Sequence, residues 1–242
     1  MEWIRGSDGL NTLFLPIQCH DMYIPPSFRI DDPAKLSAFM NANSFATLVT
    51  CNDGVPFATH LPVRHFCVDG VCTTLVSHMA RANPQWRHFS TNSEVLTIFT
   101  GPHAYISPSW YATDVAVPTW NYTTTHVYGM PTLMNDHAQI VSMLDETVRF
   151  YERSFAEPWP GTVPDDLRDQ LIDSIVAFEI RVTRVEGKFK LGQNRSQEDI
   201  NGVHEALAAA THYQDRELSD LMATEGLVNR QTHADNCGKP SA

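Results

Sequence analysis

The sequence predicts an α+β fold that is mainly β, a small barrel of antiparallel strands with peripheral helices. Six or more segments have the length and the β-branched or alternating composition of strands. Short turn signals such as Asn52-Asp53-Gly54 separate the first of them, as in hairpins. Most segments with helical spacing follow later. At 242 residues, one domain can bury a full core.

The first half of the chain indicates a helix followed by a meander. Asp32-Pro33 is typical of a helix start, with a capping residue before a proline at the first helical position. Leu36, Phe39 and Met40 follow at helical spacing. The turns at 52–54 and at Asp69-Gly70 then predict three antiparallel strands, over 45–51, 55–66 and 71–76.

The rest of the chain alternates between the two periods. We expect a short helix over 82–89, strands over 95–100 and 122–133, and a segment at 104–106 that extends the earlier strand or starts another. Helices are predicted over 136–155, 165–172 and 196–210, and a last strand over 176–185. Residues 1–21 are predicted to be an N-terminal extension, 22–227 a single domain with C-terminal helices, and 228–242 a disordered tail with little to bury.

Composition limits the classes of function. A net charge of −11 disfavours broad nucleic-acid binding, which needs a cationic surface. No run approaches the roughly 20 apolar residues of a membrane helix, and no secretory leader is recognisable. A cytoplasmic protein with reduced thiols is expected from its five cysteines. Cys67 and Cys72 flank a turn, where they either face each other across a hairpin or serve as small apolar residues.

Four blocks are richer in polar and aromatic residues than plain strands and turns. The densest is 186–196, where three cations and two amides lie close together, a composition that suits a phosphate-bearing ligand. The others are 77–86, 101–111 and 117–122. Neither a dinucleotide fingerprint, a nucleophile elbow nor a metal-ligand spacing is recognisable, so no metal is expected.

In this order, the four blocks resemble the PaiB-type FMN-binding negative transcriptional regulators, and the resemblance runs from Met22 to about Leu227. It implies an FMN-binding split barrel with FMN as the cofactor. It also implies a homodimer with two flavin sites at its interface. Some site residues would then serve the partner's flavin.

The resemblance also implies the site residues. The phosphate candidates are Ser77, His78 and Arg81, with Asn83 behind them, and a strand below the ring carries Thr59, His60 and Leu61. The remaining cofactor candidates are Ser107, Ser109, Trp110, Trp120, Asn121, Lys190, Gln193, Asn194 and Arg195. Each has an ordinary alternative: a solvated surface cation, simple strand alternation, or an aromatic of the core.

The function expected first is an FMN-dependent oxidoreductase acting on a small molecule. No residue stands out as its general acid or base, although Tyr111, His60 and His103 are candidates. The alternative is a transcriptional regulator that binds through partners or through a basic patch of Arg181, Arg184, Lys188 and Arg195. A flavin reservoir or sensor without turnover is a third possibility.

Overall fold

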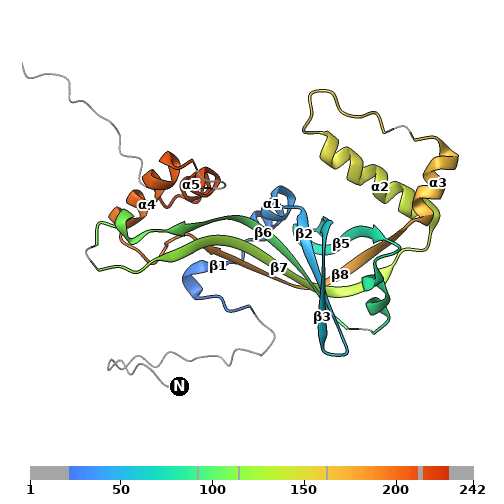
Figure 1. Ribbon diagram of the computed structural model, residues 1–242, viewed down its shortest axis with the longest axis horizontal. Helices are drawn as coiled ribbons and strands as arrows, with labels where there is room; N and C mark the ends of the chain where they lie inside the picture. Colours follow the sequence, from blue (N-terminus) through green and yellow to red (C-terminus); the bar gives the residue numbers. More distant parts are fainter. Residues whose placement is uncertain (1–21, 92, 114, 162, 212–214, 229–242) are drawn as a thin grey trace, which may run out of the picture.

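An antiparallel sheet forms the centre of the fold, and the computed structural model describes it within residues 22–91, 93–113, 115–161, 163–211 and 215–228 (Figure 1). The predicted extension at 1–21 and the tail from 229 onward lie outside these described residues. The eight strands are β1 (Arg29–Ile30), β2 (Phe45–Asn52), β3 (Val55–Pro62), β4 (Arg64–Val68), β5 (Val71–Ala80), β6 (Val95–Ile106), β7 (Thr119–Leu133) and β8 (Ile175–Lys190).

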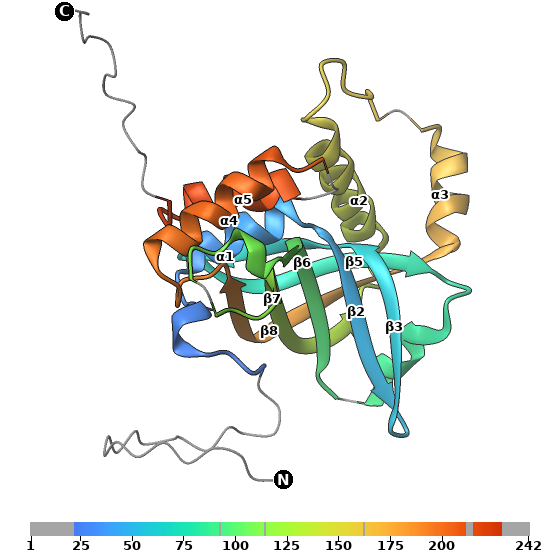
Figure 2. The ribbon, with the colours of Figure 1, turned by 60° about the vertical axis from the view of Figure 1, so that its left-hand side comes forward.

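The order of the strands explains why the sheet closes into a barrel. The order is β3-β2-β6-β7-β8-β5-β4, with the short β1 paired to β8. Strands β3 and β4 therefore lie at opposite edges, yet Val63 alone separates them along the chain. The hydroxyl of Ser77 on β5, the neighbour of β4, reaches the opposite edge by donating to the carbonyl of Pro62 on β3 at 2.7 Å. The sheet must curl to bring its edges together, as Figure 2 shows, and the predicted barrel is confirmed.

The barrel interior is apolar, and large side chains from its long strands fill it. Phe99, Phe178 and Phe189 are at most 2% exposed, and Met40 of the first α-helix joins the same cluster. Burying each such side chain contributes roughly 1.5–3 kcal/mol relative to leaving it in water. This core fixes the strands whose ends carry the candidate site residues.

Five α-helices of the described chain lie around the barrel: α1 (Pro33–Ala42), α2 (His137–Glu152), α3 (Asp165–Asp173), α4 (Gln197–Ala209) and α5 (Asp215–Thr224). Figure 1 shows α4 and α5 over one end of the long sheet and α2 and α3 over the other. The carboxylate of Asp32 caps α1 by accepting from the backbone of Ala34 and Lys35, as predicted. Helix α5 was not predicted. No described helix is long and apolar enough to span a membrane.

The turns confirm the hairpin predictions. Asp53 and Gly54 have φ values of 52° and 78°, and Asp69 and Gly70 have 51° and 80°. Two successive residues with positive φ are the signature of the type I′ turn that suits a two-residue hairpin. The second turn places Cys67 directly opposite Cys72, and both thiols are free.

Several expected elements have different bounds or types, and β5, β6 and β7 are all longer than predicted. The strand predicted over 55–66 is two strands, because the chain crosses from one sheet edge to the other at Val63. The helix expected over 82–89 is a 3-10 helix, η2 (Pro84–Thr91). The last strand continues to Lys190, so the first half of the polar block at 186–196 pairs with β7 and is not a loop.

Candidate functional site

The predicted site residues form two groups on the sheet. We call the first the β3–β5 cluster; it consists of Thr59, His60, Leu61, Ser77, His78, Arg81 and Asn83. The second, the β7–β8 cluster, consists of Ser107, Ser109, Trp110, Trp120, Asn121, Lys190, Gln193, Asn194 and Arg195. Ala177 of β8 pairs with His78, and Lys190 of β8 pairs with Tyr122. These β8 residues are 13 positions apart, roughly 40 Å of extended strand.

In the β3–β5 cluster, Asn83 joins the end of β5 to β3. Its amide nitrogen donates to the hydroxyl of Thr59 at 2.9 Å, and its side-chain oxygen accepts from the backbone of Gln85 at 3.0 Å. His60 is exposed, and its Nδ1 lies 2.9 Å from the Thr47 hydroxyl on β2. Leu61 is 7% exposed, so its side chain belongs to the core and only its backbone is left to contact a ligand.

The three phosphate candidates do not converge in this structure. Ser77 and His78 are neighbours on β5, so their side chains point to opposite faces of the strand. Ser77 is buried against the other sheet edge, whereas His78 lines a cavity beside α2 and α3, where burial lowers its pKa. Arg81 is exposed, and its Nε donates to the carbonyl of Asp173 at 2.6 Å. Arg81 remains a phosphate candidate on the basis of exposure and charge.

The β7–β8 cluster brings cations and aromatic rings together. The ammonium of Lys190 donates to the hydroxyl of Thr119 and to the carbonyl of Trp120, each at 2.5 Å. Partial burial, Lys188 and Arg195 lower the pKa of Lys190. The indole of Trp120 is 52% exposed and meets the ring of Tyr105 edge to face at 6.0 Å. This pair is an exposed aromatic surface beside a cation.

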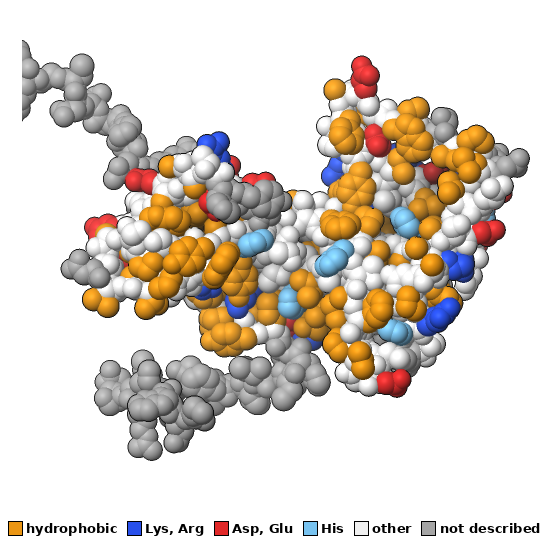
Figure 3. All heavy atoms as spheres, in the orientation of Figure 1, with side chains coloured by type: hydrophobic (Ala, Val, Ile, Leu, Met, Phe, Trp, Pro, Cys, Tyr) orange, Lys and Arg blue, Asp and Glu red, His pale blue; other side chains and the backbone are white. Residues whose placement is uncertain are grey.

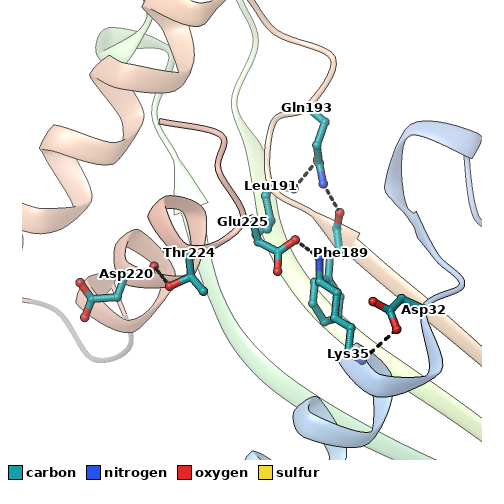
Figure 4. Close-up of polar contacts among 8 residues, drawn as sticks. All are labelled: Asp32, Lys35, Phe189, Leu191, Gln193, Asp220, Thr224 and Glu225. Atoms are coloured by element: carbon teal, nitrogen blue, oxygen red, sulfur yellow. Dashed lines mark hydrogen bonds and ion pairs between the residues drawn. The ribbon is translucent and has the colours of Figure 1, made fainter. Parts of the chain in front are cut away.

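The loop after β8 holds the rest of this cluster. The carboxamide of Gln193 accepts from the backbone of Leu191 at 2.8 Å and donates to the carbonyl of Phe189 at 2.6 Å (Figure 4). Its amide therefore shapes the loop. Asn194 is exposed, and the guanidinium of Arg195 lies 4.5 Å from the ring centre of Tyr111. Asn121 is 3% exposed, which favours a role in the fold over contact with a cofactor.

The short 3-10 helix η3 (Pro108–Trp110) completes this cluster. The Ser107 and Ser109 hydroxyls lie 2.8 Å apart, and Ser107 also caps the helix. The backbone of Trp110 is packed so closely against Gly202 of α4 that a side chain at that position would overlap its carbonyl oxygen. Trp110 itself packs partly buried against the core.

Sequence reasoning missed Asp199, which holds the loop behind Trp110. Its carboxylate accepts from the backbones of Ala112 and Thr113 at 2.9 and 3.2 Å and from the Thr113 hydroxyl at 3.0 Å. Burial raises its pKa, but these hydrogen bonds and one with Ser196 outweigh burial and lower it. The only sequence signal was its place in the first turn of α4, where any acid is favourable.

The two clusters fit FMN in the kind of groups they offer. The β7–β8 cluster supplies cations, hydroxyls and an exposed aromatic surface, and the β3–β5 cluster supplies Arg81 and the edge of β3. The phosphate of FMN requires cations and hydroxyls, and its flat ring requires an aromatic or apolar wall with a strand edge beside it. The β8 partner of His78 is 13 positions from Lys190, whereas the row of paired residues through His60 reaches β7 at His126, four positions from Tyr122.

Comparisons with known proteins place this geometry in context. Residues 22–184 match the family described as "Putative FMN-binding domain". The chain is 36% identical over 209 residues to protease synthase and sporulation protein PAI 2 of Bacillus subtilis, which covers 83% of this chain and 96% of that protein. It is also 30% identical over 165 residues to an uncharacterized protein of Emericella nidulans, over 53% of this chain and 64% of the relative.

A solved structure supports the fold. It is described as that of a "putative 5-nitroimidazole antibiotic resistance protein" from Bacteroides thetaiotaomicron, and it superposes with a TM-score of 0.50 at 14% identity. The match covers 66% of this chain and 85% of the other. At this level of identity the likeness concerns the fold alone.

Proposed function

Because the chain belongs to the family of putative FMN-binding domains, we propose that it is a homodimeric flavoprotein that uses FMN to oxidise or reduce a small molecule. The family match confirms FMN as the predicted cofactor. The proposed flavin-binding domain is 22–227, since α4 and α5 add Leu207, Leu218 and Met222 to the same core as the barrel.

The position of Arg81 at the far end of β8 from Lys190 supports the dimer, because the backbone of Arg81 donates to Ser174 just before β8 and Lys190 ends β8. In a two-fold dimer, the commonest symmetric assembly, each interface contact occurs twice. The β3–β5 cluster of one subunit can then meet the β7–β8 cluster of the other, and two equivalent sites result. Arg81 would contribute from one subunit, and Arg195 with the Trp120–Tyr105 aromatic pair from its partner.

The outer face of the sheet is the surface we propose for the interface. Phe45 is 70% exposed on β2, and its ring lies 6.5 Å from that of the exposed His60 on β3. Further along this face, Val49 of β2 pairs with Leu96 of β6, and both are half-buried. An apolar stretch of this kind on a strand face is typical of a surface that a partner covers.

Light scattering on Phe45→Asp tests the interface. A charge at this position should convert the dimer into a monomer, because a buried unpaired carboxylate is costly. The matched control is Val71→Asp, which places the same charge at another exposed strand residue, 52% exposed in the β4–β5 hairpin. A monomeric wild-type protein with full FMN affinity would contradict the dimer. An equal effect of both variants would contradict this choice of face.

The chain's own residues would bind, orient and shield the cofactor. FMN, when bound, supplies the electron or hydride transfer. Cations such as Arg81 or Arg195 would neutralise its phosphate, and the Trp120–Tyr105 pair would cover its ring. His60 lies at the exposed edge of β3, where it can exchange a proton with a small molecule. A small acidic protein suits such a substrate better than it suits nucleic acid.

Two measurements test the flavin chemistry. Cofactor released by heat should comigrate with FMN and not with FAD; FAD, or no uptake of flavin on reconstitution, would contradict FMN binding. The FMN-loaded protein should then lose its visible flavin absorbance under anaerobic addition of NADH or NADPH and regain it with an electron acceptor. If dithionite reduces the bound FMN but neither NADH nor NADPH does, a nicotinamide is not the electron donor of this protein.

Transcriptional regulation is the second candidate, because the relative in Bacillus subtilis is named for a part in sporulation. The basic patch expected for it is weak in this structure. Lys188 is 7% exposed and donates to the carbonyl of Tyr23 at 2.8 Å, and Arg184 pairs with Glu186 at 2.5 Å. Electrophoretic mobility shift at two salt concentrations separates the two functions. A sequence-specific, salt-sensitive shift would favour regulation.

A further inference from the structure

A cavity of about 690 Å³ lies between α2, α3 and the loop that joins them, outside the barrel. Its volume is within the range of small-molecule sites, about 300–1,000 Å³. The apolar part of its wall includes Val141, Leu144, Val148, Trp159, Leu171 and Ile172. Hydrophobic side chains gather over α2, α3 and this loop in Figure 3. The cavity can therefore hold the apolar body of a ligand.

The polar part of the wall carries charges of both signs. Arg149, Arg153 and Arg168 line the cavity together with two acids, Asp145 and Glu152. The carboxylate of Glu152 accepts from the backbone of Trp159 at 2.7 Å, which ties the loop to α2. Arg149 and Arg153, four residues apart at the end of α2, are the cations that can meet an anionic group of a ligand.

Contacts within the chain hold the walls in place. Met143 of α2 packs on Val76 of β5 and Ala177 of β8. His137 at the start of α2 lies 3.2 Å from the carboxylate of Asp169 on α3. The first contact joins α2 to the sheet, and the second joins the start of α2 to α3 at the surface.

The cavity shares one residue, His78, with the β3–β5 cluster. Arg81, Thr59 and His60, which we propose to face FMN, do not line it. The β7–β8 cluster lies at the other end of the sheet (Figure 1). A ligand here would therefore occupy a second site on each subunit.

We propose that this cavity binds a small organic anion with an apolar body, such as an aromatic or aliphatic acid. Arg149 and Arg153 attract its anionic group, and Trp159 with the apolar wall of α2 and α3 covers its body. Arg149 also donates from its Nε to the carbonyl of Asp145 at 3.2 Å, which holds its side chain along α2 beside the cavity.

The test uses the full FMN-loaded chain and two dyes of similar apolar size. The anionic probe is 8-anilinonaphthalene-1-sulfonate, and the neutral probe is N-phenyl-1-naphthylamine. We expect saturable binding of the anionic probe at one site per subunit. The double variant with Arg149→Ala and Arg153→Ala should weaken binding of the anionic probe at least tenfold and binding of the neutral probe less than threefold. Arg87→Ala, a surface arginine outside this cavity, is the matched control and should change neither.

A second variant guards against misfolding of the first. Leu171→Glu puts a negative charge on the cavity wall at a side chain that is 54% exposed, so it should fold normally and weaken the anionic probe at least tenfold. Unchanged anionic binding in both variants, or equal weakening of the two dyes by the arginine pair, would overturn the proposal. So would stoichiometric displacement of the dye by FMN. FMN content measured on the same samples distinguishes this failure from failure of the flavin proposal.

Discussion

The amide of Asn83, at the end of β5, donates a 2.9 Å hydrogen bond to the hydroxyl of Thr59 in the middle of β3. Because β3 and β5 lie on opposite sides of the barrel seam, this bond helps to close it. Asn83→Ala should lower the free energy of unfolding by about 1–3 kcal/mol, since it also removes the acceptor for Gln85.

A double-mutant cycle checks this bond directly. Urea denaturation of Asn83→Ala, Thr59→Val and the combined variant should give a coupling energy of about 1 kcal/mol. Additive effects of the two changes would show that the bond does not stabilise the fold.

Arg81→Ala should weaken FMN binding about tenfold to a hundredfold, the loss expected for one charge-assisted hydrogen bond to phosphate. Riboflavin, which lacks the phosphate, should bind the variant and the wild type almost equally. Arg81→Lys should recover part of the loss, because a point charge cannot reproduce the planar fork. Fluorescence titration measures all three affinities.

The same titration also tests whether Arg81 has a purely structural role. The Nε of Arg81 also donates to the carbonyl of Asp173, so a structural role for Arg81 would be to hold the end of α3. Equal weakening of FMN and riboflavin would assign Arg81 to that role. Arg87→Ala serves as the matched control, because it removes an exposed arginine of η2.

Mixed dimers should test whether the two clusters meet across the interface. Arg81→Ala and Arg195→Ala homodimers should each bind FMN weakly at both sites. A heterodimer with one subunit of each kind has one site that carries both changes and one site that carries neither. It should therefore bind one FMN per dimer with wild-type affinity. A purified heterodimer without a tight site would contradict the shared site.

The stability of the folded chain should depend on pH through the carboxylate of Asp199. Because its folded pKa is lowered, it stabilises the folded chain above its unfolded pKa of about 4, and that contribution is lost as the pH falls through the folded value. Asp199→Asn should therefore be less stable than wild type at pH 7, and the difference should shrink below pH 4. Asp220→Asn, at an exposed position of α5, is the control and should show no such trend.

The sequence by itself determined most of the elements of this fold. Asp32 before Pro33 marked the start of α1, and the Asp-Gly pairs at 53–54 and 69–70 marked hairpin turns. These signals are local, because a cap or a left-handed turn depends on one or two residues. The polar blocks, by their family resemblance, pointed to FMN, which the family match confirms.

The tertiary structure decided which of those residues lie together. Ser77 and His78 are adjacent in sequence, yet strand alternation sends one to the barrel seam and the other to the cavity beside α2. Lys190 is the last residue of β8, a strand so long that Lys190 lies roughly 40 Å along it from the partner of His78. Asp199 became recognisable only when α4 packed beside the loop at 112–113. Local patterns fix the conformation of short segments, but the pairing of distant strands sets the position of a side chain in space.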